Sequence, residues 1–426
     1  MKKNISSARL NESYIDIDHQ SGLKILLYPM KNYKSTFGLI ATKYGSIDTT
    51  YMNSNGKTIK NCIGIAHFLE HKMFESENGD AFDLFAKTGA DSNAYTSADK
   101  TAFYFSCSKN YCQSLEILLN FLTTPYFADT TVKKEQEIIK QEIQMFVDNS
   151  DWQGYANLLK CMYYNPDISA DIAGTSSSIH KITSEMLYDT YNAFYNLKNM
   201  VLVIAGNLKV EEVMEIADRI LVKSDEFKTQ KQYPIEPDKV KKKYCEISLP
   251  VAVDMFNIGF KQKISLQGGN IKNQIIDELL VEIIVGDITQ LYKELYDEGL
   301  INQTFDGDTF TAGNNCAIIY SGESRNPKEV YARLCDRIDE LQKNGIEKDV
   351  FELCKTAAYG KYISMFSRAE SIATAMAHTH FIGCGIYDAL EIAANLNYNE
   401  VCERLRDSIS SKNSVLSVVH ATEEEK

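Results

Sequence analysis

The spacing of apolar residues divides the first half of the chain into short strands and longer helices. Runs rich in β-branched and aromatic residues predict strands, and apolar residues that recur every three or four positions predict helices. The predicted strands are 14–18, 23–27, 37–42, 101–107 and 200–205. The predicted helices are approximately 62–74, 81–87, 114–122, 132–147 and 184–195. This mixture of elements is typical of an α+β domain.

The second half of the chain repeats this order of elements. Its predicted elements are a strand at 247–260, helices at 273–285, 288–296 and 400–409, and a strand at 415–419. Two short echoes at offsets of about 210 residues support a duplication. One is KNMVL at 198–202, which resembles KNSVL at 412–416. The other is a Gly-Asp pair, at 79–80 and again at 286–287, that precedes an amphipathic helix leading to a glycine.

Residues 223–243 interrupt the repeat. They contain seven Lys, two Pro and almost no apolar periodicity, which is typical of a linker. We therefore expect a first domain in 1–222, a linker in 223–243 and a second, related domain in 244–426. A chain of 426 residues is also too long for one compact core.

The composition restricts the class of protein. The chain is 44% hydrophobic and 24% charged, as a globular protein is, and its net charge of −13 argues against partners such as nucleic acid or an anionic membrane. Its ten cysteines form no CxxC pair, which favours reduced thiols. No signal-peptide segment opens the chain, and no apolar run reaches the length of a membrane span. We expect a soluble, cytoplasmic protein.

The segment GIAHFLEHKMF at 64–74 carries the chemistry. His67 and His71 are four residues apart, so on a helix both imidazoles project from one face and can reach one metal ion. Glu70 lies close enough to touch a metal-bound water, and H-x-x-E-H is the inverted form of the zinc-protease motif. The alternative is a helix that buries its apolar residues and leaves both histidines and the glutamate in solvent.

A zinc site with two histidines needs a third protein ligand and an open position for water. The predicted helix at 131–146 offers Glu135, Glu137 and Glu142. Glu135 and Glu142 are seven residues apart and share a face, whereas Glu137 is rotated away. One of the pair would bind the metal and the other would orient a ligating histidine. Without the histidine pair, these glutamates would be interpreted as ordinary surface residues.

These residues resemble the pitrilysin/insulinase family of zinc metallopeptidases. The resemblance rests on HFLEH at 67–71 and the later Glu-x6-Glu pair. It extends to SNAYTS at 92–97, which is similar to the family's Asn-Ala-x-Thr-Ser block. Further matching segments are 101–104, 151–152, 172–175 and 200–206. The resemblance covers most of the first half strongly and the second half weakly.

The resemblance implies a metal site and a catalytic base. His67, His71 and Glu142 would hold one Zn²⁺ per chain, and Glu70 would be the general base that activates the zinc-bound water. Glu135 matches a glutamate that supports catalysis without binding the ion. Only 70 residues separate His71 from Glu142, fewer than is usual in the family, and a shortened loop would explain this.

The resemblance also implies a fold and a substrate site. Each domain would have a mostly antiparallel sheet packed by helices, and the two domains would form half of a peptidase clamshell. Asn93 and Ala94 match the strand edge that receives the substrate backbone.

The second half departs from the family pattern. Family peptidases carry an Arg and a Tyr, seven residues apart around a Gly-Leu pair, that contact the substrate. Here Leu295 and Asn302 occupy those positions, and the helix at 273–285 has no histidine pair. We expect a degenerate repeat without a metal site, and a heterodimer in which a related subunit lacking HxxEH supplies the Arg/Tyr pair. The alternative is a homodimer in which Tyr292 or Tyr296 replaces the pair.

The predicted function is therefore a zinc endopeptidase that hydrolyses short or unfolded peptides, with peptide maturation as one candidate role. The alternative is a non-catalytic structural or peptide-binding subunit of a two-subunit complex. Glu70 separates these hypotheses, because a subunit that only binds or supports has no need of a general base.

Overall fold

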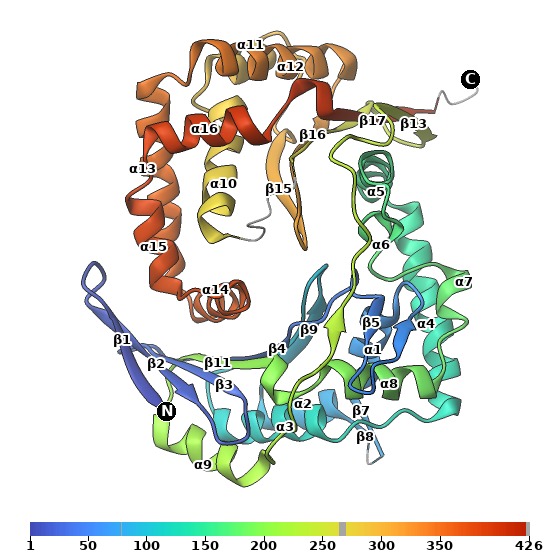
Figure 1. The fold of residues 1–426 in the computed structure, drawn as a ribbon, viewed down its shortest axis with the longest axis vertical. Helices are drawn as coiled ribbons and strands as arrows, with labels where there is room; N and C mark the ends of the chain where they lie inside the picture. Colours follow the sequence, from blue (N-terminus) through green and yellow to red (C-terminus); the bar gives the residue numbers. More distant parts are fainter. Residues whose placement is uncertain (78, 264–269, 423–426) are drawn as a thin grey trace. The chain divides into compact units, whose positions relative to one another are not determined.

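The computed structural model describes residues 1–77, 79–263 and 270–422 (Figure 1). The chain forms two compact units, and neither is one continuous stretch. Unit 1 comprises Met1–Ile143, Asp171–Tyr233 and Ile363–Asp388, and unit 2 comprises Gln144–Ala170, Pro234–Tyr362 and Ala389–Lys426. The boundaries 1–222 and 244–426 concern the repeat in the sequence and stay a prediction.

Unit 1 is built on a seven-stranded sheet of order β1-β2-β3-β11-β4-β10-β9. The strands are β1 (Lys2–Ser7), β2 (Glu12–Asp18), β3 (Lys24–Pro29), β4 (Thr36–Thr42), β9 (Asp91–Thr96), β10 (Thr101–Cys107) and β11 (Met200–Gly206). β11 runs parallel to β3, and the other neighbours are antiparallel. Every residue of the central strands β4 and β11 is buried, as expected for continuous apolar runs covered on both faces.

Helices cover both faces of this sheet (Figure 1). One face packs against the core that contains residues of α1 (Ile65–Met73), α2 (Ala81–Thr88), α3 (Tyr111–Thr123), α8 (Ser184–Phe194) and α9 (Val210–Ile220). The other face is covered by α14 (Ala369–Ile382), which contacts β11, β4 and β3 and comes from the second half of the chain. The long helix α4 (Asp129–Asp148) follows α3.

Unit 2 repeats the plan with a five-stranded sheet of order β13-β17-β14-β16-β15. The strands are β13 (Tyr244–Leu249), β14 (Met255–Lys261), β15 (Asp306–Ala312), β16 (Asn315–Glu323) and β17 (Ser414–Ala421). β13 and β17 are parallel and the rest antiparallel, the same pattern as β3-β11-β4-β10-β9. The expected repeat of a mixed, mostly antiparallel fold is therefore confirmed.

The helices of unit 2 also follow the order of unit 1. They are α10 (Ile271–Val285), α11 (Gln290–Asp297), α12 (Pro327–Asn344), α13 (Lys348–Met365), α15 (Ile386–Ala394) and α16 (Tyr398–Ser408). One more helix, α5 (Ser150–Met162), comes from the first half of the chain and packs on β13, β14 and β17. α5 in unit 2 and α14 in unit 1 are thus matching exchanges, in which each half of the sequence supplies one helix to the sheet of the other.

The remaining elements are short. They are β5 (Thr50–Met52), β6 (Thr58–Lys60), β7 (Glu75–Ser76), β8 (Gly79–Asp80), β12 (Gln230–Lys231), α6 (Pro166–Ser169), α7 (Ser176–Ile179), η1 (Leu197–Asn199) and η2 (Ser411–Asn413). The single strand expected at 247–260 is wrong, because β13 ends at Leu249 and β14 begins at Met255. Pro250 stands directly after β13 and has no N–H to continue the ladder. None of the described helices is long and apolar enough to cross a membrane.

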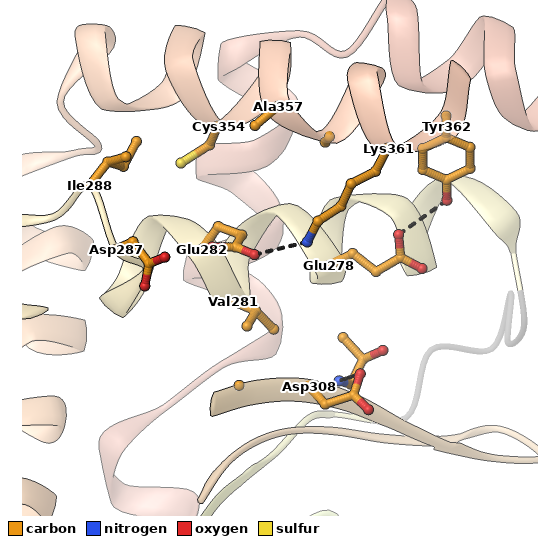
Figure 2. Close-up of a pocket in the computed structure, with 13 residues that line it drawn as sticks. Glu278, Val281, Glu282, Asp287, Ile288, Asp308, Cys354, Ala357, Lys361 and Tyr362 are labelled. Atoms are coloured by element: carbon orange, nitrogen blue, oxygen red, sulfur yellow. Dashed lines mark hydrogen bonds and ion pairs between the residues drawn. The ribbon is translucent and has the colours of Figure 1, made fainter. Parts of the chain in front are cut away.

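A hollow of about 530 Å³ lies in unit 2 between α10, α13 and β15 (Figure 2). Glu278 and Glu282 project from α10, one helical turn apart. On α13, Lys361 donates to Glu282 over 3.1 Å, and the hydroxyl of Tyr362 donates to Glu278 over 3.1 Å. The i, i+4 spacing of the two carboxylates indicates a shared helix face, but nothing in the sequence indicates the hollow itself.

Candidate metal centre

The start of α1 is fixed by two glycines that lie against each other. Gly64 caps the helix with φ +93°, and a Cβ there would lie 2.7 Å from the carbonyl oxygen of Ala173. A Cβ on Gly174, whose φ is +82°, would lie 2.7 Å from the carbonyl oxygen of Ile63. Both positions therefore require glycine, and their close approach sets where α1 begins.

α1 buries one face and turns its histidines towards α4. Phe68, Leu69 and Met73 are almost fully buried in the core of unit 1. The side chain of His67 is only 12% exposed and that of His71 27%. The alternative of a helix with solvated histidines is therefore wrong.

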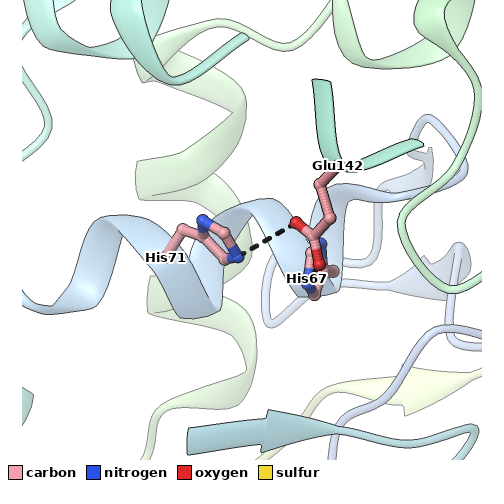
Figure 3. A group of neighbouring side chains, drawn as sticks. All are labelled: His67, His71 and Glu142. Carbon is pink, nitrogen blue, oxygen red and sulfur yellow. Dashed lines mark ion pairs between the residues drawn. The ribbon is translucent and has the colours of Figure 1, made fainter. Parts of the chain in front are cut away.

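His67, His71 and Glu142 converge on one point (Figure 3). The two imidazole centroids are 4.5 Å apart, and each Nε2 lies 3.6 Å from a different carboxylate oxygen of Glu142. One ligand atom from each of the three residues lies within 4.8 Å of the others. Within the described part of the chain, this is the one group of three or more His, Cys, Asp or Glu side chains that meets this criterion.

The spacing of these atoms fits a zinc ion. A nitrogen–oxygen separation of 3.6 Å is too long for a hydrogen bond. It is close to the separation of about 3.3–3.4 Å between two ligands that bind one tetrahedral Zn²⁺ at about 2.05 Å each. Two imidazoles and one carboxylate also form a donor set found in catalytic zinc sites.

Glu135 lies beside the group and holds one of its histidines. Nδ1 of His71 donates to Oε1 of Glu135 over 3.0 Å, which leaves the lone pair of Nε2 directed at Glu142. Nδ1 of His67 is buried and has no hydrogen-bond partner among the described residues. Glu137 is exposed and pairs with Lys140, so the structure places Glu142, and not Glu137, with the histidines.

The surroundings shift the pKa values of the two histidines in opposite directions. Burial, with a smaller contribution from His71, lowers the pKa of His67 to about 3, so this ring stays neutral and able to bind a metal. Burial alone would lower the pKa of His71, but its hydrogen bond to Glu135 and the neighbouring carboxylates raise it above the usual value. Burial also raises the pKa of Glu142.

Glu70 is on the same helix but outside the ligand group. Its side chain is buried, and Oε2 accepts a hydrogen bond of 2.5 Å from the hydroxyl of Thr96 on β9. Burial raises the pKa of Glu70, and the hydrogen bond from Thr96 opposes this shift. The hydrogen bond occupies one carboxylate oxygen and leaves Oε1 for another partner.

Asn93 and Ala94 lie on β9, the last strand of the described sheet. Asn93 is exposed, and its Oδ1 accepts a hydrogen bond of 2.8 Å from the N–H of Ala94. This N–H therefore points away from β10, and the side chain of Asn93 covers it at the sheet edge.

Residues 58–176 match the model of the insulinase family, peptidase family M16, and residues 181–358 match the model described as the M16 inactive domain. A Bacillus subtilis protein named uncharacterized zinc protease YmfH is 32% identical over 422 residues, which cover 96% of this chain and 97% of that protein. The chain belongs to peptidase family M16. The resemblance to the pitrilysin/insulinase family seen in the sequence is therefore confirmed.

Two further relatives of this M16 chain extend the comparison. The crystal structure of a putative M16-like peptidase from Alicyclobacillus acidocaldarius superposes with a TM-score of 0.91 at 28% identity and covers 98% of both chains. The probable mitochondrial-processing peptidase subunit beta of Schizosaccharomyces pombe is 29% identical over 171 residues, or 39% of this chain and 37% of that protein.

The positions of the expected Arg/Tyr pair in this M16 chain are occupied by structural residues. Leu295 on α11 is completely buried. Asn302 follows α11, where its amide donates to Glu323 over 2.8 Å and its Oδ1 accepts from the N–H of Thr304. Neither residue supplies a cation or a phenol. Tyr292 and Tyr296, the alternative candidates, stack with centroids 6.2 Å apart.

Proposed function

We propose that this M16 chain is a zinc-dependent endopeptidase that hydrolyses short or unfolded peptides. The observation that carries the proposal is the convergence of His67, His71 and Glu142, with the buried carboxylate of Glu70 on the same helix. A structural subunit has no need of a ligand set and a carboxylate placed in this way.

The proposed reaction divides the chemistry between the metal and Glu70. A Zn²⁺ ion held by His67, His71 and Glu142 would lower the pKa of a coordinated water and polarise the scissile carbonyl. Glu70 accepts a proton from the attacking water through Oε1, since Thr96 holds Oε2, and later donates that proton to the leaving amine. Glu135 keeps His71 in the required tautomer throughout.

The proposed substrate binds as an added strand along β9. Because β9 ends the described sheet, its outward N–H and C=O groups can pair with an extended peptide. A carbonyl of the substrate would replace Oδ1 of Asn93 as the acceptor for the N–H of Ala94. Backbone pairing of this kind suits peptides of loosely defined sequence, including a precursor peptide that is cut during maturation.

We further propose that a related subunit completes the site. The buried Leu295 and the hydrogen-bonded Asn302 leave this chain without the Arg/Tyr pair, so the partner would supply it in a heterodimer. The relative from Schizosaccharomyces pombe is itself named as a subunit, which supports a two-subunit arrangement. A homodimer that uses Tyr292 or Tyr296 is the alternative.

A non-catalytic role in peptide binding is the second candidate function. The observation that favours it is the match of residues 181–358 to the M16 inactive-domain model, together with the missing Arg/Tyr pair. This candidate keeps the zinc site for stability and has no use for Glu70.

Cleavage of a quenched fluorogenic peptide by the zinc-loaded chain tests the proposal. Glu70→Gln should reduce the rate by roughly 10²–10⁴-fold, because general base catalysis contributes about that much, while zinc content and melting temperature stay unchanged. Glu137→Gln is the matched control on α4. Glu137 is exposed and forms an ion pair with Lys140, away from the histidines. Measurable and equal rates for wild type and Glu70→Gln would contradict the peptidase. A silent, zinc-loaded wild type that gains activity with a related subunit would support the heterodimer.

A further inference from the structure

We propose that Lys72 is a positioning residue that holds α1 against α4 and thereby keeps the three metal ligands at their spacing before any ion binds. The inference rests on the proposed function, because it assigns Lys72 a role in the zinc site of His67, His71 and Glu142. Lys72 itself touches neither ligand nor substrate.

Lys72 is buried to a degree that is rare for a lysine. Its side chain is 1% exposed, although lysines are almost never fully buried unless they are paired. Nζ donates to the hydroxyl of Thr131 over 2.9 Å and forms an ion pair with Glu75, which is on β7. Thr131 in turn donates to the carbonyl of Ala128, which leaves its oxygen lone pairs free to accept from Lys72.

The contact with Thr131 continues a series of polar contacts between the two helices. Thr131, Glu135 and Glu142 are four and seven residues apart and lie on one face of α4. Along α1 the partners follow in the opposite order. His67 meets Glu142, His71 meets Glu135, and Lys72 meets Thr131.

These three contacts differ in whether they require a metal ion. The contact between His67 and Glu142 spans 3.6 Å and becomes attractive only when a cation lies between the two groups. The contact between Lys72 and Thr131 is a complete hydrogen bond without an ion. Only two residues of α4, Val132 and Ile139, are fully buried, so apolar packing does little to fix the register of this helix. The hydrogen bond from Lys72 to Thr131, together with that from His71 to Glu135, therefore sets the position of α4 along α1.

An ammonium at this place is costly, which argues against a role in packing alone. Burial removes the hydration of the ammonium, and the contacts that replace it are the hydroxyl of Thr131 and the carboxylate of Glu75. Thr131 is in the first turns of α4, where the helix dipole also disfavours a cation. An apolar side chain such as methionine would fill the same space without these costs.

The test measures zinc affinity, by competition with a chelator, and the melting temperature of the metal-free protein. Lys72→Met should bind Zn²⁺ about tenfold more weakly than wild type, the lower end of what residues behind metal ligands contribute. Its metal-free melting temperature should be no lower, because Glu75 is 29% exposed and can turn to solvent. Lys134→Met is the control, since it removes a nearby exposed positive charge but no contact of the series.

Each outcome decides between positioning and packing. Unchanged zinc affinity in Lys72→Met would overturn the proposal, as would an equal loss in Lys134→Met. A lower melting temperature with unchanged affinity would show a structural role only. If Lys72→Met does not fold, Thr131→Val removes the acceptor and keeps the volume, and it should show the same tenfold loss. A wild type that binds no Zn²⁺ would contradict the proposed function itself, which separates that failure from failure of the Lys72 assignment.

Discussion

The same pair of helices carries opposite chemistry in the two units. In unit 1, α1 presents His67 and His71 to a carboxylate on α4. In unit 2, the corresponding helix α10 presents Glu278 and Glu282 to Lys361 and Tyr362 on α13. Both helices use the i, i+4 spacing, so the fold supplies the geometry in each unit and the residue types decide what it can hold.

The difference lies in where the positive charge comes from. The three residues of the unit 1 group include no lysine or arginine, and a metal ion can provide the positive charge beside the carboxylate. In unit 2, the ammonium of Lys361 already pairs with Glu282. We therefore expect one zinc per chain, in unit 1. We expect that duplication of the fold does not duplicate the metal site, because Lys361 and Tyr362 already pair with the two carboxylates of the second group.

Removing one donor from each unit gives the largest contrast. His67→Ala should weaken zinc binding by about a hundredfold to a thousandfold, because a binding free energy of roughly 10–16 kcal/mol is shared among few ligands. Glu278→Ala in unit 2 should leave the affinity and the stoichiometry of one unchanged. Isothermal titration with Zn²⁺ measures both values. If wild type bound a second Zn²⁺ and Glu278→Ala lost it, the comparison between the two units would be contradicted.

We also expect unit 1 to determine how the stability of the metal-free protein changes in acid. The pKa of His67 is about 3 in the folded protein and about 6.5 when unfolded, so between these values the unfolded state binds the extra proton. Stability contributed by neutral His67 is therefore present above pH 6.5 and is lost as the pH falls. At pH 5 the loss is about 2 kcal/mol.

Denaturant unfolding at pH 7 and pH 5 checks this expectation. His67→Asn should lose about 2 kcal/mol less than wild type between the two pH values, since asparagine does not titrate there. Glu278→Gln serves as the unit 2 control and should keep the wild-type dependence. Identical pH dependence in wild type and His67→Asn would show that the acid response arises elsewhere.

Local patterns were enough to predict which side chains of α1 and α4 converge, but not every contact that supports them. The apolar stripe of Phe68, Leu69 and Met73 predicts α1 and the direction of its histidines. The seven-residue spacing of Glu135 and Glu142 predicts their shared face. The hydrogen bonds from Thr96 to Glu70 and from Lys72 to Thr131 depend on how separate elements pack, and nothing in the neighbouring sequence indicates them.

The sequence also does not predict the exchange of helices between the two units. α5 and α14 have no local feature that distinguishes a helix packed on its own sheet from one packed on the sheet of the other half. The choice depends on which sheet face is left uncovered. The repeat itself was visible because its echoes, KNMVL and KNSVL, lead into the buried strands β11 and β17.

The sheet edges of the two units offer the finest contrast. On β9, the neutral side chain of Asn93 covers the outward N–H of Ala94. On β15, the carboxylates of Asp306 and Asp308 cover the N–H groups of the residues that follow them, over 2.9 and 2.7 Å. A hydrogen bond to a charged acceptor is roughly twice as strong as one to a neutral acceptor, so a peptide should displace the cover on β9 more easily than that on β15.

Asn93→Asp gives β9 the kind of cover found on β15. Its carboxylate should hold the N–H of Ala94 more firmly, and the KM of peptide cleavage should rise by about three- to tenfold, equivalent to roughly 1 kcal/mol. The value of kcat should change little, because Glu70 and the metal ligands are untouched. Asp308→Asn makes the reverse change on β15 and should leave both constants as they are. A KM that responds to Asp308→Asn but not to Asn93→Asp would move the substrate strand from β9 to β15.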